Sequence, residues 1–122
     1  MSNGNLTELE RLVVDVQESG QAWVKAKLKA DQLDEDAKPY LASLENEIEA
    51  QEKDSISEAK LERLAKGSQQ YRGYIREMCL ARGEALKKRV RYEGLQALFE
   101  AKRSEFSLEK VKIEKGIFHT GG

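Results

Sequence analysis

The chain has 122 residues, of which 39% are hydrophobic and 35% charged, with one proline and a net charge of −1. This composition excludes a loop-rich or β-sandwich fold and is typical of long helices and coiled coils. The near-zero net charge excludes a global field that attracts nucleic acid or a membrane, so any electrostatic partner must be recognised by a local patch.

Features that mark export or membrane insertion are missing from the sequence. The single cysteine, Cys79, excludes an internal disulfide. No apolar run approaches the roughly 18 residues of a membrane span. The first residues lack the basic and apolar segments of a signal peptide. We therefore expect a soluble cytoplasmic protein without membrane contact.

A first long helix is predicted over about residues 5–53. Asn5 with Glu8, or Thr7 with Glu10, has the spacing of a capping box at its start. Apolar or small residues then recur every three or four positions, which indicates a continuous seam against another helix. The seam of this first helix is Leu9, Leu12, Val16, Gly20, Trp23, Ala26, Ala30, Leu33, Ala37, Tyr40, Leu44 and Ile48.

Pro39 lies inside this helical pattern. Proline removes one backbone hydrogen bond and clashes with the preceding turn. Because the seam keeps its phase across the proline, we expect a kink or brief break near residues 36–38. The alternative is a loop, with Pro39 in the first turn of a new helix.

A short connector helix is predicted over about residues 55–66. Ser55 with Glu58 repeats the capping-box spacing, Gly67 is placed to end the helix, and Ser68 is placed to cap the next one. The second long helix is predicted over residues 68–114. Its stripe, with a charged gap around Lys88, is Tyr74, Met78, Ala81, Ala85, Tyr92, Leu95, Phe99 and Phe106.

Two features of the second long helix have more than one interpretation. Gly73, Gly83 and Gly94, with Ala81 and Ala85, either form a thin face that a neighbouring backbone approaches or merely lower helix propensity. At the end, Gly116 is a candidate stop after which Ile117 and Phe118 fold back. Residues 115–122 are expected to form a flexible tail.

Two long helices of similar length joined by a short connector predict an all-α, coiled-coil-like antiparallel hairpin. The charges favour the same arrangement. Residues 31–54, the acidic block, carry nine acids and two bases, whereas residues 60–91 carry ten bases and three acids. Folding the chain back sets these opposite net charges of −7 and +7 beside each other, between neutral flanks.

A two-helix hairpin has little interior, so its large aromatic side chains would be half exposed. Burying each of them is worth about 1.5–3 kcal/mol, which favours self-association. We expect a homo-oligomer, most simply a dimer of hairpins in a four-helix bundle. The candidate self-association residues are Trp23, Tyr40, Phe99 and Phe106.

The residues give little support for catalysis, and we predict a non-enzymatic protein without cofactor or metal. His119 is the only histidine and falls in the predicted tail. Glu45 and Glu49 have the spacing of some di-metal bundles but lack the histidine three residues after glutamate, so we interpret them as a solvated acidic face. Cys79 has no histidine nearby in sequence and is predicted to be a small core residue.

One segment combines bases with Tyr92, with Arg72, Arg76, Tyr71 and Tyr74 upstream, and is a candidate nucleic-acid-binding site. Such residues hold phosphates and stack on bases. The alternative is that the bases face the acidic block, and the near-zero net charge favours it. Lys102 and Arg103 are interpreted as ordinary surface charges. The candidate residues are Arg82, Lys87, Lys88, Arg89, Arg91 and Tyr92.

Several runs resemble small helical proteins encoded by tailed bacteriophages. These runs are residues 56–65 (ISEAKLERLA), Tyr71 with Tyr74, Ala81-Arg82, residues 89–93 (RVRYE) and residues 99–104 (FEAKRS). The resemblance implies a phage or prophage origin, a place in the host cytoplasm and an accessory role near early replication and recombination genes. It supplies no catalytic residues.

Together these patterns predict a helical interaction or assembly protein that acts through protein–protein contacts. The alternative function is a nucleic-acid-binding accessory of phage replication or recombination that uses residues 82–92.

Overall fold

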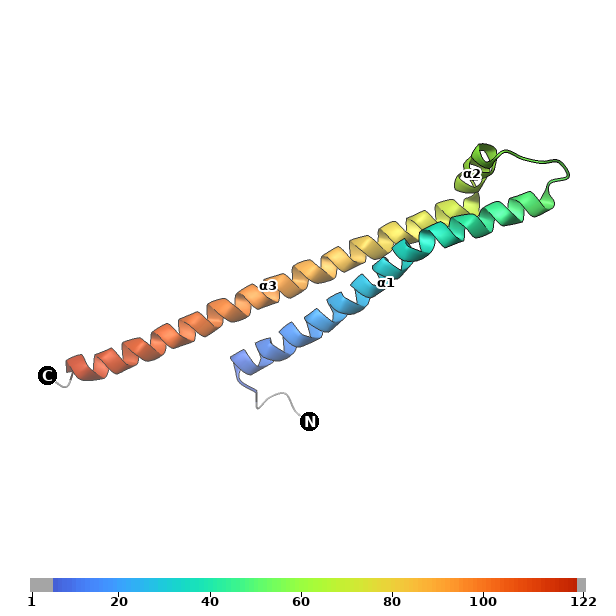
Figure 1. Ribbon diagram of the computed structural model, residues 1–122. Coiled ribbons are helices and arrows are strands. Elements are labelled where there is room, and N and C mark those ends of the chain that lie inside the picture. Colours follow the sequence, from blue (N-terminus) through green and yellow to red (C-terminus); the bar gives the residue numbers. More distant parts are fainter. Residues whose placement is uncertain (1–5, 121–122) are drawn as a thin grey trace. The chain divides into compact units, whose positions relative to one another are not determined.

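The computed structural model describes residues 6–120, with side chains up to Ile113. Its described part consists of three helices: α1 (Glu8–Gln51), α2 (Glu58–Lys66) and α3 (Gln69–Thr120) (Figure 1). The long helices α1 and α3 pack antiparallel, and the short α2 connects them. The predicted all-α helical hairpin is therefore confirmed.

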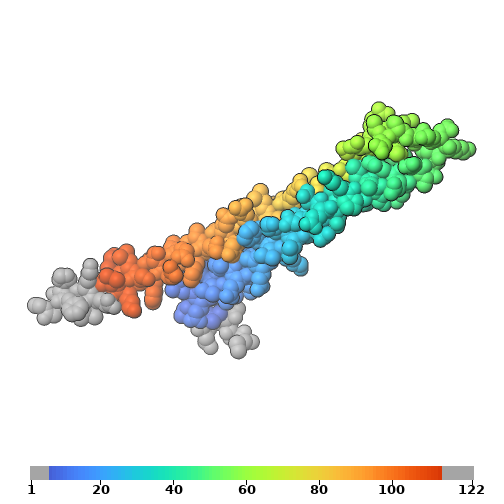
Figure 2. All heavy atoms as spheres, in the orientation of Figure 1, coloured from blue at the N-terminus to red at the C-terminus, as the bar shows by residue number. Residues whose placement is uncertain are grey.

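The chain divides into two compact units, each of which pairs part of α1 with part of α3. Unit 1 comprises Met1–Trp23 and Lys87–Gly122, and unit 2 comprises Val24–Leu86. In unit 1 the first turns of α1, blue in Figure 2, lie against the orange part of α3. Unit 2 contains the rest of α1, all of α2 and the first turns of α3.

Thr7 caps the start of α1. Its Oγ1 accepts a hydrogen bond from the Glu10 backbone N–H at 3.1 Å, and its carbonyl accepts one from the Arg11 N–H at 3.0 Å. These bonds satisfy donors that have no partner within the first turn. Of the two predicted capping pairs, Thr7 with Glu10 therefore marks the start, whereas Asn5 lies outside the described residues.

α1 continues through Pro39 to Gln51, so the predicted brief break and the alternative loop are both wrong. The proline leaves the carbonyl of Glu35, one turn earlier, without its helical donor. Both residues are exposed, so water reaches this part of the helix. A solvent-facing proline is thus accommodated without ending the helix, and the kink stays a prediction.

Of the predicted caps of α2 and α3, only the N-cap of α2 differs in the structure. Ser57, not Ser55, is the N-cap of α2, because its extended backbone lets its Oγ accept from the Lys60 N–H at 3.3 Å. Gly67 ends α2 and donates to the Arg63 carbonyl at 3.0 Å, as predicted. Ser68 then caps α3 by accepting from the Tyr71 N–H at 3.2 Å.

The end of α3 corrects the sequence interpretation. The helix continues through Gly116 to Thr120, so the candidate stop and the fold-back of Ile117 and Phe118 are wrong. The flexibility of residues 115–122 stays a prediction. Glycine lowers helix propensity by about 1 kcal/mol, but by itself this does not end a helix. Residues 121–122 lie outside the described part.

The seam predicted for α1 is confirmed along its whole length, because each of its members is buried or half-buried. Leu12, Ala30 and Leu44 are its most buried members. On α3, Met78 and Ala81 are buried. Lys88 and Lys102 are half-buried between the apolar members of the α3 stripe.

Candidate interaction surfaces

An aromatic stack holds the two helices of unit 1 together. The rings of Trp23 and Tyr92 stack with centroids 5.4 Å apart and an interplanar angle of 28°. The Tyr92 ring lies over Gly20, where an added Cβ would be 2.9 Å from Tyr92 Cε1. The Tyr92 hydroxyl accepts a hydrogen bond from Gln96 Nε2 at 2.8 Å. Trp23 and Tyr92 are therefore engaged within the hairpin.

A second stack occupies unit 2. The rings of Tyr40 and Tyr74 lie 4.6 Å apart at 16°, and the Tyr74 hydroxyl donates a hydrogen bond to the Leu33 carbonyl. Burial raises the pKa of Tyr74, and the nearby Asp36 carboxylate raises it further. Two of the four candidate self-association residues, Trp23 and Tyr40, are thus stacked inside the chain.

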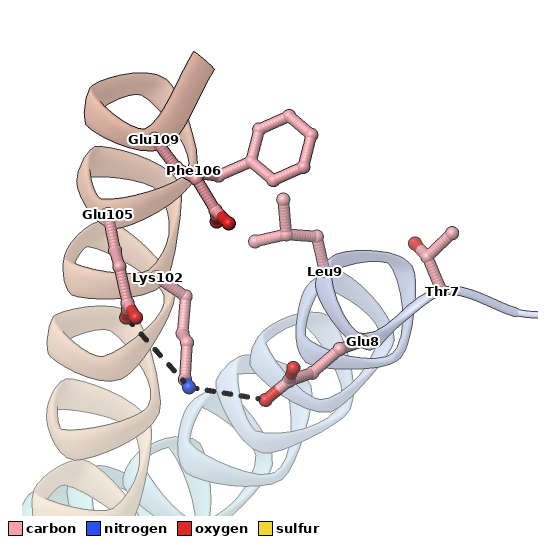
Figure 3. A pocket seen from close by; sticks show the side chains of 7 residues that line it. All are labelled: Thr7, Glu8, Leu9, Lys102, Glu105, Phe106 and Glu109. Atoms are coloured by element: carbon pink, nitrogen blue, oxygen red, sulfur yellow. Dashed lines mark ion pairs between the residues drawn. The ribbon is translucent and has the colours of Figure 1, made fainter. Parts of the chain in front are cut away.

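The other two candidates lie in unit 1 and differ in exposure. Phe99 is half-buried at the seam, whereas Phe106 is 61% exposed. Phe106 lines an open hollow of about 310 Å³ together with Thr7, Glu8, Leu9, Lys102, Glu105 and Glu109. Figure 3 shows Leu9 and Phe106 facing each other across this hollow. Phe106 therefore contacts apolar surface of its own chain and is still open to solvent.

Lys102 closes the charged side of this hollow. Its Nζ lies 3.4 Å from the Glu8 carboxylate and 4.0 Å from that of Glu105, as the dashed lines in Figure 3 mark. The interpretation of Lys102 as an ordinary surface charge is wrong, because it occupies a seam position between Phe99 and Phe106. The seven-residue step between these phenylalanines was the signal in the sequence.

The candidate nucleic-acid-binding residues are not equivalent. Arg82 forms an ion pair with Asp34 of the acidic block, as the alternative interpretation predicts. Arg89 instead pairs with Glu93 of its own helix at 2.6 Å. Lys87 and Arg91 are exposed, and Lys88 is half-buried.

The aromatic part of this candidate site is engaged elsewhere. Tyr92 stacks on Trp23 and Tyr74 stacks on Tyr40, so neither ring is free to stack on a nucleic-acid base. Residues 82–92 therefore offer positive charge without a free aromatic ring of the kind that single-strand binding proteins use, and Tyr71 upstream is half-buried.

Two further predictions concern small residues on α3. Cys79 is exposed, so its prediction as a core residue is wrong. Met78 occupies the seam, and the next residue is turned about 100° away from it. Cβ atoms added at Gly73, Gly83 or Gly94 would meet nothing within 4 Å, so no other segment approaches them closely in this chain.

α3 also carries a second apolar stripe that the sequence interpretation missed. Its residues recur at helical spacing and all are exposed. Most lie on the side turned away from the seam, whereas Leu98 lies at the edge of the stripe and also lines a hollow with Leu12 and Asp15 of α1. Val90 is 64%, Leu98 45% and Leu108 57% exposed. We call this surface the outer face of α3; it consists of Val90, Gly94, Ala97, Leu98, Ala101, Ser104, Leu108 and Val111.

Chemistry of other kinds has little support in the described residues. Among side chains that the structure describes, no group of three or more His, Cys, Asp or Glu residues is placed to hold a metal ion. His119 lies outside those side chains. Searching the described helices for one with the length and apolar content of a membrane span also finds none.

Comparison with known proteins gives no assignment: no protein-family model, curated protein or solved structure matches this chain. The resemblance to small phage proteins therefore stays a prediction.

Proposed function

We propose that this chain is a non-enzymatic interaction protein that assembles through the outer face of α3. The observation that carries this proposal is the second, exposed apolar stripe on a helix whose first stripe is already covered by α1. Helices that are apolar on opposite sides are normally covered on both. Covering the outer face would gain about 25 cal/mol for each Å² of apolar surface removed from water.

The assignment of the assembling surface differs from the one made from sequence. Trp23 and Tyr40 stack on Tyr92 and Tyr74 and so stabilise the hairpin itself. Val90, Leu98 and Leu108 instead supply exposed aliphatic surface in unit 1. This assignment moves the interface from the aromatic seam to the far side of α3.

The mass of the full chain in solution tests the proposal. Sedimentation equilibrium over a wide concentration range is expected to show a multiple of the monomer mass that dissociates on dilution. Replacing Val90 and Leu108 by Ser should shift this dissociation to higher concentration while helicity by circular dichroism is unchanged. A parent that sediments as a monomer at every concentration contradicts the proposal.

A second candidate function is binding of a nucleic-acid backbone. The observation in its favour is that Lys87 and Arg91 are exposed and make no ion pair with any residue that the structure describes. Without free aromatic rings, such binding would rest on phosphate contacts and weaken steeply with salt. A salt titration with single-stranded DNA tests it, with Lys87, Lys88, Arg89 and Arg91 replaced by Ala as the comparison. Absence of binding at low salt rules it out.

A further inference from the structure

We propose that the outer face of α3 binds the same face of a second copy of this chain, with the two α3 helices antiparallel and a twofold axis level with the bond between Leu98 and Phe99. This inference rests on the proposed function and specifies its partner, surface and orientation. All residues that it uses lie in unit 1, between Lys87 and Val111.

The apolar residues match under this symmetry. With the helices antiparallel about this axis, Val90 lies within about 1.5 Å along the helix of the level of Leu108 of the second copy, and Gly94 lies as close to the level of Ser104 of the second copy. Ala97 lies equally close to the level of Ala101 of the second copy. Large residues thus meet large residues towards the ends, and small residues meet at the centre, where they allow the helices to approach closely.

The surroundings of Gly94 leave room for such an approach. A Cβ added at Gly94 would meet nothing within 4 Å in the chain itself. Ala97, Ala101 and Ser104 are exposed as well. This central part of the face therefore has no partner in its own hairpin that a second copy would have to displace.

The charges along one edge of the face are self-complementary only in the antiparallel orientation. Lys87 and Arg91 lie eleven and seven residues before Leu98, whereas Glu105 and Glu109 lie seven and eleven residues after it. The twofold axis therefore sets Arg91 beside Glu105 of the second copy and Lys87 beside Glu109 of the second copy, each twice. A parallel pair would instead set this edge beside the opposite edge of the second copy, where Glu93 and Glu100 already pair within α3, so these contacts would not form.

These edge residues are accessible for such contacts. Arg91 is exposed, and the Glu105 side chain is 72% exposed with its ion pair to Lys102 at the long distance of 4.0 Å. Exposed ion pairs contribute only about 0–1 kcal/mol each. They therefore select the orientation, while the apolar contacts supply most of the affinity.

The opposite edge of the face brings no unpaired carboxylate to the contact. Glu93 pairs with Arg89 at 2.6 Å, and Glu100 pairs with Arg103 at 3.3 Å, both within α3. Each acid that would approach the second copy on this edge is thus neutralised by a base of its own helix.

A charge exchange tests the partner and the surface. At low salt, Arg91→Glu and Glu105→Arg are each expected to weaken dimerisation about tenfold, because each single change places like charges together twice. The double variant Arg91→Glu/Glu105→Arg should recover parental dimerisation. The control Arg63→Glu makes the same charge change on exposed α2 and should leave dimerisation unchanged.

Mixing the two single variants sharpens the test. An equimolar mixture of Arg91→Glu and Glu105→Arg should form a heterodimer more tightly than either variant forms its own dimer, since one copy then supplies carboxylates and the other guanidiniums. Association that neither weakens in the single variants nor recovers in the mixture overturns the antiparallel pairing. If replacing Val90 and Leu108 by Ser still weakens the association of the parent, the proposed assembly through the outer face stands.

Thiol crosslinking tests the orientation in a Cys79→Ser background. With a short bifunctional maleimide, Leu98→Cys should crosslink into a covalent dimer, whereas Val90→Cys should not, because antiparallel packing separates its two copies by about 25 Å. Crosslinking of both variants to the same extent would show a parallel pair and overturn the antiparallel assignment. Capture of a different protein with no self-association would also overturn the proposal.

Discussion

At the residue scale, Gly20 and Tyr92 show how a glycine in the seam leaves room for a large aromatic ring from the other helix. The Tyr92 ring lies over the Gly20 backbone and reaches Trp23, with which it stacks. In the sequence Gly20 is only a weak point of the seam, costing about 1 kcal/mol relative to Ala. In the structure it is the position that lets the aromatic stack form.

Gly20→Ala is therefore expected to destabilise the protein despite its better helix propensity. The new Cβ would lie 2.9 Å from Tyr92 Cε1, so the stacked ring must move. The matched control Gly83→Ala, where the Cβ meets nothing, should raise the free energy of unfolding by up to about 1 kcal/mol. Urea unfolding measures both, and a gain at Gly20 equal to that at Gly83 would contradict the explanation.

Tyr74 makes stability depend on pH in the alkaline range. Burial raises its pKa above the ordinary value near 10, so folding favours the protonated hydroxyl that donates to the Leu33 carbonyl. The stabilisation is complete below the unfolded pKa and is lost as pH rises through the folded pKa. Other groups titrate in this range, so the contribution of Tyr74 to the pH dependence of stability is obtained by comparing the parent with Tyr74→Phe.

We expect Tyr74→Phe to lower the free energy of unfolding by about 0.5–1.5 kcal/mol at pH 8, the typical contribution of one hydrogen bond. The difference between parent and variant should shrink above about pH 10. Thermal unfolding at several pH values measures it. A difference that grows with pH would have the wrong sign for this cause.

At the element scale, apolar periodicity decides which residues of the long helices are buried, while local backbone geometry decides where a helix begins. Every predicted seam residue of α1 is at least half-buried, and the helix runs through Pro39. The start of α2 depends on which serine has the extended backbone of an N-cap, and this is Ser57. Capping-box spacing favours Ser55, because Glu58 lies three residues after it, but the backbone conformation that decides the cap is not visible in the spacing.

Pro39→Ala is expected to stabilise α1. Alanine restores the N–H that bonds the Glu35 carbonyl and removes a clash, changes worth up to about 3 kcal/mol in a helix interior. The neighbouring Lys38→Ala, also at an exposed position, serves as control and should change stability by less than about 0.5 kcal/mol. Denaturant unfolding gives both values; a loss of stability in Pro39→Ala would mean that the protein needs a bend there.

At the scale of the whole molecule, α1 covers only one of the two apolar stripes of α3. The outer face of α3 remains exposed in the single chain. Because a partner that binds only the folded chain stabilises it by mass action, self-association makes thermal stability depend on protein concentration.

The melting temperature of the parent should therefore rise with protein concentration, and Ala101→Lys should abolish this rise by placing a charge at the centre of the outer face. Ala101 is exposed, so the folded monomer should tolerate the lysine. Ala42→Lys makes the same change at an exposed position of α1 and should keep the concentration dependence. A parent melting temperature that is independent of concentration would argue against assembly.

Helical periodicity by itself determined the fold class and the membership of the α1 seam, because these depend on spacings of three or four residues that any local segment displays. The hairpin followed from the similar lengths of the two long helices, the short connector and the opposite charge blocks. Only the tertiary structure decided that Trp23 stacks on Tyr92, that Lys102 joins the seam and that Cys79 faces solvent. Such outcomes depend on the register between segments far apart in the chain. The outer face of α3 could be recognised only in the structure for the same reason. Whether an apolar stripe is covered or exposed is known only when the neighbouring helices have been placed.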